Sequence, residues 1–474
     1  MDIATLALIG VVIFVAALLS GVVERTRFPQ VALFLLLGLA LGPLGMGLVH
    51  FELTSPVLET LATLGLVLVL FTDAVGVNIT EARRHRTLIR VVLGPGTLLT
   101  AALIGVVAWA LLGVAPGFAA ILGAALASTD PVMMRGLLRS PDVPVPARHV
   151  LALESGLNDL VLLPIVLIAM ALVGGAKEQW APAAIKLFLV GPLTGIAIGF
   201  VGVALLERVR RWMGVRRDYE SLYALGLAFS AYAAAEAVHA SGFLAAFAAG
   251  LTIAASDAEL CDCFLDLGQA AAEIFLLFTF VAFGSSLIWT GFEGVTWRSV
   301  VFAIVALGAR SAVLAATLPH KGLDPRSRRL IIWFGPRALS TLLLVLLPVF
   351  AGLPGAEGLF APAALVVMLS IVVHGGALMV FGKKSATGAA APATPAPLDS
   401  SRIGRATERI TLEELKALQE RGEHVILLDV RKDGAWNESD QKARGAIRLP
   451  PDNAAQRGAE LALPRNDWLV AYCA

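Results

Sequence analysis

Carboxylate and hydroxyl side chains interrupt two segments of this chain that are otherwise apolar enough to span a lipid bilayer. One segment contains Ser128-Thr129-Asp130-Pro131, and the other contains Glu154-Ser155-Gly156-Leu157-Asn158-Asp159. A carboxylate in the middle of a membrane is costly unless a positive charge meets it. The two segments therefore predict a functional site that holds a cation, a proton or an arginine side chain.

The spacing within the second segment divides its polar residues between two helix faces. Glu154 and Asn158 are four residues apart, as are Ser155 and Asp159, so each pair shares one face. Arg337 is a permanent cation whose natural partner is a buried carboxylate in bidentate contact. We expect Arg337 to pair with Glu154, with Asn158 completing the hydrogen bonds of that structural pair.

The other face of this helix is left for an ion. Asp159, Ser155 and the Thr129 carbonyl, together with Asp73 from the third apolar segment, offer hard oxygen ligands that suit an alkali cation. We expect Asp130 instead to compensate the positive N-terminal ends of half-helices that meet nearby.

Two prolines predict broken helices in corresponding places. Proline removes a helix hydrogen bond, so Thr129-Asp130-Pro131 and Gly335-Pro336-Arg337 each indicate an interruption. They fall in the fifth and twelfth of the predicted membrane spans, residues 117–138 and 329–351. An inverted repeat of spans 1–6 and 8–13, with span 7 as connector, would bring the two breaks together.

Arg310 is a further buried cation, in the middle of the eleventh predicted span. We expect it to pair with a core acid, and the sequence leaves Glu273 and Glu236 open as partners.

Composition places the chain among polytopic membrane proteins. Of its 474 residues, 57% are hydrophobic and 15% charged, with a mean hydropathy of +0.79, whereas soluble domains carry roughly 25% charged residues. The basic residues are dispersed through short loops, which argues against nucleic-acid binding. Three cysteines are too few for a disulfide framework.

A window of about 20 residues predicts thirteen transmembrane helices in an all-α fold. Their approximate ranges are 4–20, 31–49, 57–76, 88–113, 117–138, 149–173, 183–206, 219–238, 241–256, 269–289, 299–318, 329–351 and 360–381. Arginine and lysine gather in alternate loops, near residues 25–27, 83–90, 135–148, 208–217, 321–329 and 383–384. This asymmetry predicts that those loops are cytoplasmic, the N-terminus outside and the C-terminal segment inside.

The C-terminal part changes character. Residues 385–408 form an Ala/Pro-rich linker, and residues 409–474 have the pattern of a small α/β segment. Thr411 and Glu414 form a capping box at the start of a helix, and residues 425–431 predict a buried strand.

This segment resembles the start of a rhodanese-like domain through Asp429-Val430-Arg431, Gly445-Ala446-Ile447-Arg448 and the strand before Cys473. In rhodaneses a cysteine at that place carries a persulfide, cradled by the following loop. Because Cys473 is the penultimate residue of this sequence, we expect an incomplete segment and no sulfurtransferase activity.

Residues 1–384 resemble the NhaP-type sodium/proton antiporters, bacterial relatives of the eukaryotic sodium/proton exchangers. Ser128-Thr129-Asp130-Pro131, Glu154-Ser155-Gly156-Leu157-Asn158-Asp159 and Gly335-Pro336-Arg337 carry the resemblance. It implies a homodimer in the bacterial plasma membrane, in which a six-helix core domain moves against a dimerisation domain. It also implies that Asp159, Ser155 and the Thr129 carbonyl hold the cation, near an acid at Asp73.

The same resemblance implies a secondary transporter and not an enzyme. The asparagine at Asn158 marks the electroneutral branch of the family, which exchanges one proton for one Na+, with Li+ or K+ as alternatives. Protonation and cation binding exclude each other at the Asp159 carboxylate, so exchange requires no cofactor.

Two other functions stay open at this point. A cation channel would need a continuous polar pathway through the membrane. A membrane-anchored redox or sulfur sensor would instead place the function in the rhodanese-like tail.

Overall fold

The computed structural model divides the chain into two compact units, Met1–Ala386 and Thr387–Ala474. Besides isolated positions, the structure describes residues 29–77, 86–138, 143–175, 185–213, 217–256, 258–293, 295–318, 323–386, 421–431, 443–450 and 467–472.

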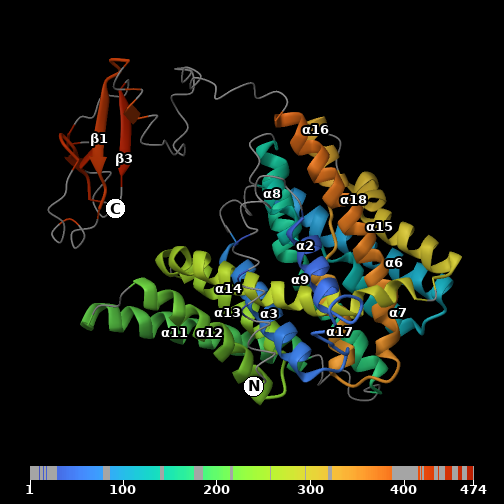
Figure 1. Ribbon diagram of the computed structural model, residues 1–474. Helices are drawn as coiled ribbons and strands as arrows, with labels where there is room; N and C mark the ends of the chain where they lie inside the picture. The colour runs from blue at the N-terminus through green and yellow to red at the C-terminus, as the bar shows by residue number, and fades with distance from the viewer. Residues whose placement is uncertain are drawn as a thin grey trace. The chain divides into compact units, whose positions relative to one another are not determined.

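All the regular secondary structure in the described part of the first unit is helical (Figure 1). In its first half the helices are α2 (Gln30–Leu41), α3 (Pro56–Val75), α5 (Arg86–Val91), η1 (Val92–Gly96), α6 (Thr97–Leu112), α7 (Pro116–Ala127), α8 (Pro131–Leu138) and α9 (Val145–Val173). In its second half they are η3 (Lys186–Val190), α11 (Gly191–Met213), α12 (Arg217–Ala237), α13 (Gly242–Ser256), α14 (Ala258–Ser285), η4 (Leu287–Phe292), α15 (Trp297–Thr317), α16 (Pro325–Trp333), α17 (Leu339–Phe350), η5 (Ala356–Leu359) and α18 (Phe360–Ala386).

Seven helical stretches among the described residues are long and apolar enough to cross a membrane. They are Pro56–Val75, Thr87–Leu112, Pro116–Met134, Val145–Val173, Lys186–Met213, Trp297–Thr317 and Ala356–Ala377. Four shorter apolar helices, at Gln30–Leu41, Gly242–Ser256, Ala270–Ser285 and Leu339–Phe350, coincide with further predicted spans. The first predicted span, 4–20, lies almost entirely outside the described residues, so the count of thirteen stays a prediction.

Several helices begin at residues whose chemistry suits a helix start. Pro56, Pro116 and Pro325 occupy first positions, where a missing N–H costs nothing. The Asp324 carboxylate caps α16 by accepting hydrogen bonds from the Arg326 and Ser327 N–H groups, at 3.0 and 2.8 Å.

The helices pack as two groups that meet along α3. In one group α11 packs on α13, and α14 packs on α2 and α3. In the other, α7 packs on α6, α9 and α17, and α15 packs on α6 and α18. Helix α3 contacts α9 and α17 of the second group (Figure 1). Its residue Asp73 lies against Gly156 of α9.

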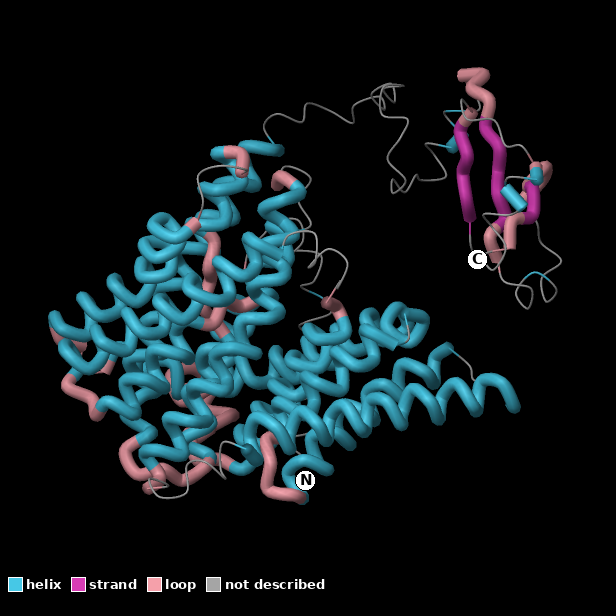
Figure 2. The backbone as a smooth tube through the Cα atoms, turned by 180° about the vertical axis from the view of Figure 1, so that it is seen from behind, coloured by secondary structure: helices cyan, strands magenta, loops and turns pink. Residues whose placement is uncertain are grey.

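The C-terminal unit contains a small parallel sheet, drawn as magenta strands in Figure 2. Its order is β2 (Ile447–Arg448), β1 (Val425–Asp429), β3 (Trp468–Tyr472), with Leu428 opposite both Ile447 and Ala471. The predicted strand is therefore present and central. Thr411, Glu414 and Cys473 lie outside the described residues.

A buried polar cluster joins the ends of these strands. The Arg431 guanidinium donates two hydrogen bonds, at 2.9 and 2.7 Å, to the buried Asp429 carboxylate, which also accepts the Tyr472 hydroxyl at 2.6 Å. The hydrogen bonds from Arg431 lower the pKa of Asp429 to about 2. The cluster keeps this acid ionised and ties β1 to β3.

Helices α2 and α14 approach until their backbones touch at two glycines. A Cβ at Gly284 would lie 2.3 Å from the Leu35 carbonyl oxygen, and one at Gly38 would lie 2.3 Å from the Val281 carbonyl oxygen. Small residues permit such contacts between membrane helices. The atoms that a Cβ at either glycine would meet belong to the backbone, which cannot move aside as a flexible side chain could.

We predict that Gly284→Ala lowers the stability of the protein by about 1–3 kcal/mol through overpacking. Gly308→Ala on α15 is the matched control, because no atom lies within 4 Å of its Cβ position. That control should be neutral or slightly stabilising, since alanine is the better helix former. Thermal melting of the purified protein in detergent measures both, and equal melting temperatures would contradict the close approach.

Candidate functional site

Two interrupted helices cross inside the helical unit. Helix α7 ends at Ala127 and α8 begins at Pro131, while α16 ends at Trp333 and α17 begins at Leu339. The two interruptions touch, because the Asp130 N–H donates a hydrogen bond of 2.9 Å to the Pro336 carbonyl. Figure 2 shows such loop segments inside the unit as well as at its ends.

The Asp130 carboxylate serves the N-termini of two half-helices at once. One oxygen accepts the Val132 N–H of α8 at 2.7 Å, and the other accepts the Leu339 N–H of α17 at 2.7 Å. The side chain is almost fully buried. A negative charge here meets unsatisfied N–H groups and the positive ends of two helix dipoles.

Arg310 lies at a helix C-terminus, whereas Asp130 lies at two helix N-termini. Its Nη1 donates hydrogen bonds to the Ile331 and Ile332 carbonyls in the last turn of α16, at 2.9 and 3.3 Å. These carbonyls lack helical partners because the helix stops at Trp333. A positive charge at a helix C-terminus is also stabilised by the negative end of the helix dipole.

The partner of Glu154 differs from the one predicted from the sequence. Arg310 donates from Nε to Glu154 Oε1 at 2.6 Å and from Nη2 to Oε2, in a buried bidentate pair. The predicted pairing of Glu154 with Arg337 is therefore wrong, because the Arg310 fork already spans both carboxylate oxygens.

The prediction that Arg310 pairs with Glu273 or Glu236 is also wrong, because Arg310 binds Glu154 and those two acids accept hydrogen bonds from other groups. Glu273 accepts a hydrogen bond from the Gln30 side chain, and Glu236 accepts the Gly242 N–H at 2.9 Å.

Glycine in the second break allows the Arg310 side chain to pass. A Cβ at Gly335 would lie 2.6 Å from Arg310 Cδ and 2.9 Å from its Nε. Arg337 instead turns to α15, where its Nη2 donates a 2.8 Å hydrogen bond to the Ala306 carbonyl. Its Nε and Nη1 are buried and have no hydrogen-bond partner among the described residues.

Asp159 is buried beside two serine hydroxyls and within electrostatic reach of the Asp130 carboxylate. Its Oδ1 accepts a 2.7 Å hydrogen bond from the Ser128 hydroxyl, and Ser340 of α17 also lies beside this carboxylate. Ser155 lies one turn earlier on the same face of α9, is buried, and donates its hydroxyl to the Ala152 carbonyl at 3.2 Å.

Asn158 binds Thr129, one of the predicted cation ligands, and does not take part in the Glu154–Arg310 ion pair. Its Nδ2 donates to Thr129 Oγ1 at 2.8 Å and reaches the Thr129 carbonyl at 3.4 Å. The expectation that Asn158 completes the hydrogen bonds of Glu154 is therefore wrong. The amide holds α9 against the extended residues of the first break.

Asp73 lies against α9 between the predicted ligands. Its Cγ is 3.9 Å from the Cβ position of Gly156, which neighbours Ser155 and precedes Asp159 by three residues. A Cβ at Gly156 would make ordinary van der Waals contact with the half-buried Asp73, so the two helices lie side by side here.

Sequence reasoning missed the roles of Ser128 and Ser340 as neighbours of Asp159. Ser128 was visible as the first residue of the Ser-Thr-Asp-Pro motif. Ser340 follows Arg337 by three residues, and only the return of α17 to the crossing places it beside Asp159.

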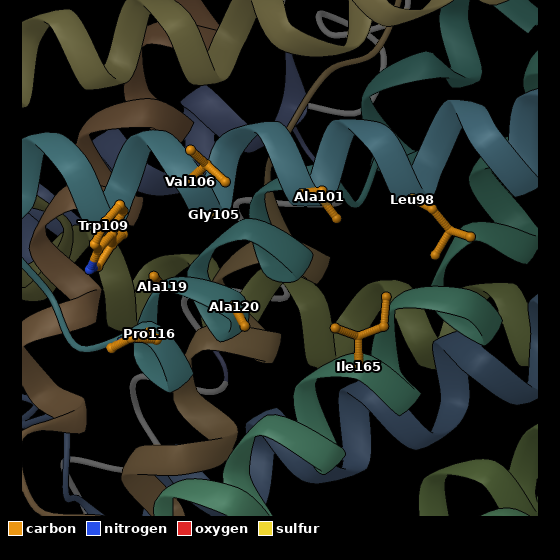
Figure 3. A pocket seen from close by; sticks show the side chains of 10 residues that line it. Leu98, Ala101, Gly105, Val106, Trp109, Pro116, Ala119, Ala120 and Ile165 are labelled. Carbon is orange, nitrogen blue, oxygen red and sulfur yellow. The ribbon is translucent and has the colours of Figure 1, made fainter.

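A separate apolar cavity of about 420 Å³ lies between α6, α7 and α9 (Figure 3). It is lined by Leu98, Ala101, Ala102, Gly105, Val106, Trp109, Pro116, Ala119, Ala120 and Ile165. With no carboxylate in its lining, this cavity is not a cation site.

The sequence of this chain matches a known protein family. The sodium/hydrogen exchanger transmembrane family matches residues 10–384, which is most of the chain. This chain belongs to the sodium/hydrogen exchanger family. The exchanger is thus a multi-pass membrane protein and a monovalent cation/proton antiporter, a secondary transporter and not an enzyme.

Named relatives of the exchanger are similar at low identity. The K+/H+ antiporter NhaP2 of Shewanella sp. strain MR-4 is 25% identical over 403 residues, covering 82% of this chain and 68% of the relative. The K+/H+ antiporter NhaP of Alkalimonas amylolytica is 24% identical over 78% of this chain and 65% of its own. The Na+/H+ antiporter NhaS2 of Synechocystis sp. is 25% identical over 65% of this chain and 52% of its own.

The fold of the exchanger matches a solved structure. The sodium proton antiporter MjNhaP1 from Methanocaldococcus jannaschii at pH 8 superposes with a TM-score of 0.65 and 18% identity. The match covers 79% of this chain and all of that chain.

The Glu154–Arg310 pair generates a prediction about stability. Glu154→Gln or Arg310→Gln alone should cost about 3–5 kcal/mol, because each leaves an unpaired buried charge. The double variant should recover part of that loss. Thermal melting in detergent over the complete double-mutant cycle measures the coupling.

Arg337 provides the control for this cycle. The pair Glu154→Gln with Arg337→Gln should show weaker coupling, since no hydrogen bond joins these side chains. A larger coupling with Arg337 than with Arg310 would contradict the observed pairing.

Proposed function

We propose that the exchanger carries a cation and a proton alternately on the Asp159 carboxylate. The observation that supports this is the distribution of charge at the crossing. Glu154 is held by the Arg310 guanidinium, and Asp130 by the N–H groups of two half-helices. The bonds of Asp159 involve neutral hydroxyl groups, so this carboxylate is available to a cation or a proton.

The cation shell follows from the neighbours of Asp159. We propose the Ser155 hydroxyl and the Thr129 carbonyl as further ligands, with Asp73 approaching from α3. Asn158 fixes Thr129, and Asp130 compensates the two helix N-termini. Oxygen ligands suit an alkali cation, and the named relatives include both potassium and sodium antiporters. Na+, K+ and Li+ are therefore the cations to compare.

The membrane arrangement belongs to the same proposal. We propose thirteen transmembrane helices, an extracytoplasmic N-terminus and a cytoplasmic C-terminal segment, on the basis of the apolar segments and the basic loops. We propose a homodimer on the basis of the family resemblance. The alternating access would move the helix group of α6, α7, α9 and α15–α18 against the group of α2, α3 and α11–α14. The rhodanese-like character of residues 409–474 is likewise a proposal, supported by the parallel sheet.

Asp159→Asn should abolish cation-driven proton flux while the protein stays folded. Asparagine keeps the shape and removes the negative charge that binds either ion. The assay is recovery of a pH-sensitive dye in reconstituted vesicles, with Na+, K+ and Li+ in turn. Glu52→Gln, in an exposed loop, is the matched control and should retain full flux. Near-normal flux in Asp159→Asn would overturn the assignment of the carrier.

Exchange should move no net charge. With Glu154 neutralised by Arg310 and Asn158 uncharged, one carboxylate of α9 alternates between one proton and one monovalent cation. Na+-driven proton flux in vesicles should then be insensitive to a membrane potential set by a thiocyanate gradient. Asp73→Asn is the companion variant, because a second titrating acid in the same site could add a proton. A flux that rises with the imposed potential would contradict one-for-one exchange.

A further inference from the structure

Two polar residues of α18 face the second helix break from outside the cation site. Ser370 and His374 are four residues apart on one face of this helix and are both buried. The Arg337 backbone N–H donates a 2.7 Å hydrogen bond to Ser370 Oγ. Ser370 Oγ in turn lies 3.1 Å from His374 Nδ1.

The imidazole extends this contact to the end of α16. His374 lies beside the main chain of Trp333, the last residue of that helix, and the two rings are 6.3 Å apart between centroids. Ser370 and His374 therefore contact the chain on both sides of residues 334–336.

The Ser370 hydroxyl links the Arg337 N–H to the His374 imidazole. Its Oγ accepts the Arg337 N–H and lies 3.1 Å from His374 Nδ1, which is also 3.3 Å from the Ser370 carbonyl oxygen. The imidazole can therefore contact both the hydroxyl and the main chain of Ser370.

The opposite side of the same break is held by Asp130. Its N–H binds the Pro336 carbonyl and its carboxylate binds the Leu339 N–H. The next residue is Ser340, which lies beside Asp159. Any shift of residues 334–338 would therefore move Ser340 and the Asp130 contacts relative to the cation site.

We propose that Ser370 and His374 are positioning residues for transport, which fix residues 334–338 so that Ser340 and Asp130 keep their places at Asp159. They do not touch the cation. This inference rests on the proposed site at Asp159, and it predicts an effect on cation affinity from a helix that contributes no ligand.

The test measures the KM for whichever of Na+, K+ and Li+ drives the fastest proton flux in the unmodified protein, together with the maximal rate in vesicles, normalised to folded protein. His374→Leu and Ser370→Ala should each raise the KM by about fivefold, the effect of losing one hydrogen bond, with little change in maximal rate. His374→Asn places an amide near the position of Nδ1 and should restore most of the affinity. His50→Leu, at an exposed loop histidine, is the matched control and should change neither value.

The outcomes separate this inference from the proposed function. Exchange by Asp159→Asn would overturn the site itself. An inactive Asp159→Asn with unchanged KM in His374→Leu and Ser370→Ala would overturn the positioning role alone. If His374→Leu does not fold, Ser370→Ala decides by the same criterion. Loss of folding in both variants would reduce the pair to a role in stability and overturn the proposal.

Discussion

The structure depends on satisfying backbone polar groups where two helices stop inside the helical unit. Hydrocarbon offers no hydrogen bonds, so non-helical backbone within the membrane-spanning part of a protein must find partners in the protein itself. Here Asp130 takes the N–H groups at the starts of α8 and α17, and Arg310 takes the last carbonyls of α16. One negative and one positive side chain thus stabilise helix ends of opposite polarity.

In this arrangement the charged side chains that hold the helices together are different from the carboxylate proposed to carry the ions. Arg310 joins the end of α16 to Glu154 on α9, so the two helices share one ion pair. Asp159, one face away on α9, is left with hydroxyl neighbours. Because Glu154 is paired with Arg310 and Asp130 is bound at two helix N-termini, a change of occupant at Asp159 need not disturb these contacts of the crossing.

Small residues make these contacts geometrically possible. Gly335 leaves room for the Arg310 side chain. Elsewhere Gly38 and Gly284 bring α2 and α14 into backbone contact. In each case the missing side chain permits a distance that an alanine would lengthen or strain, so the glycines set the geometry from which the polar contacts follow.

The sequence by itself determined the helical membrane class, the two proline-marked breaks and the acids near them, because hydropathy, proline and charge act locally along the chain. It did not determine which arginine meets Glu154, or that Asn158 binds Thr129. Those pairings depend on how the helices rotate and cross, and on whether a glycine opposite leaves a path. Arg310 and Arg337 are equivalent as residue types, and only the tertiary structure brings the Arg310 fork onto both oxygens of Glu154.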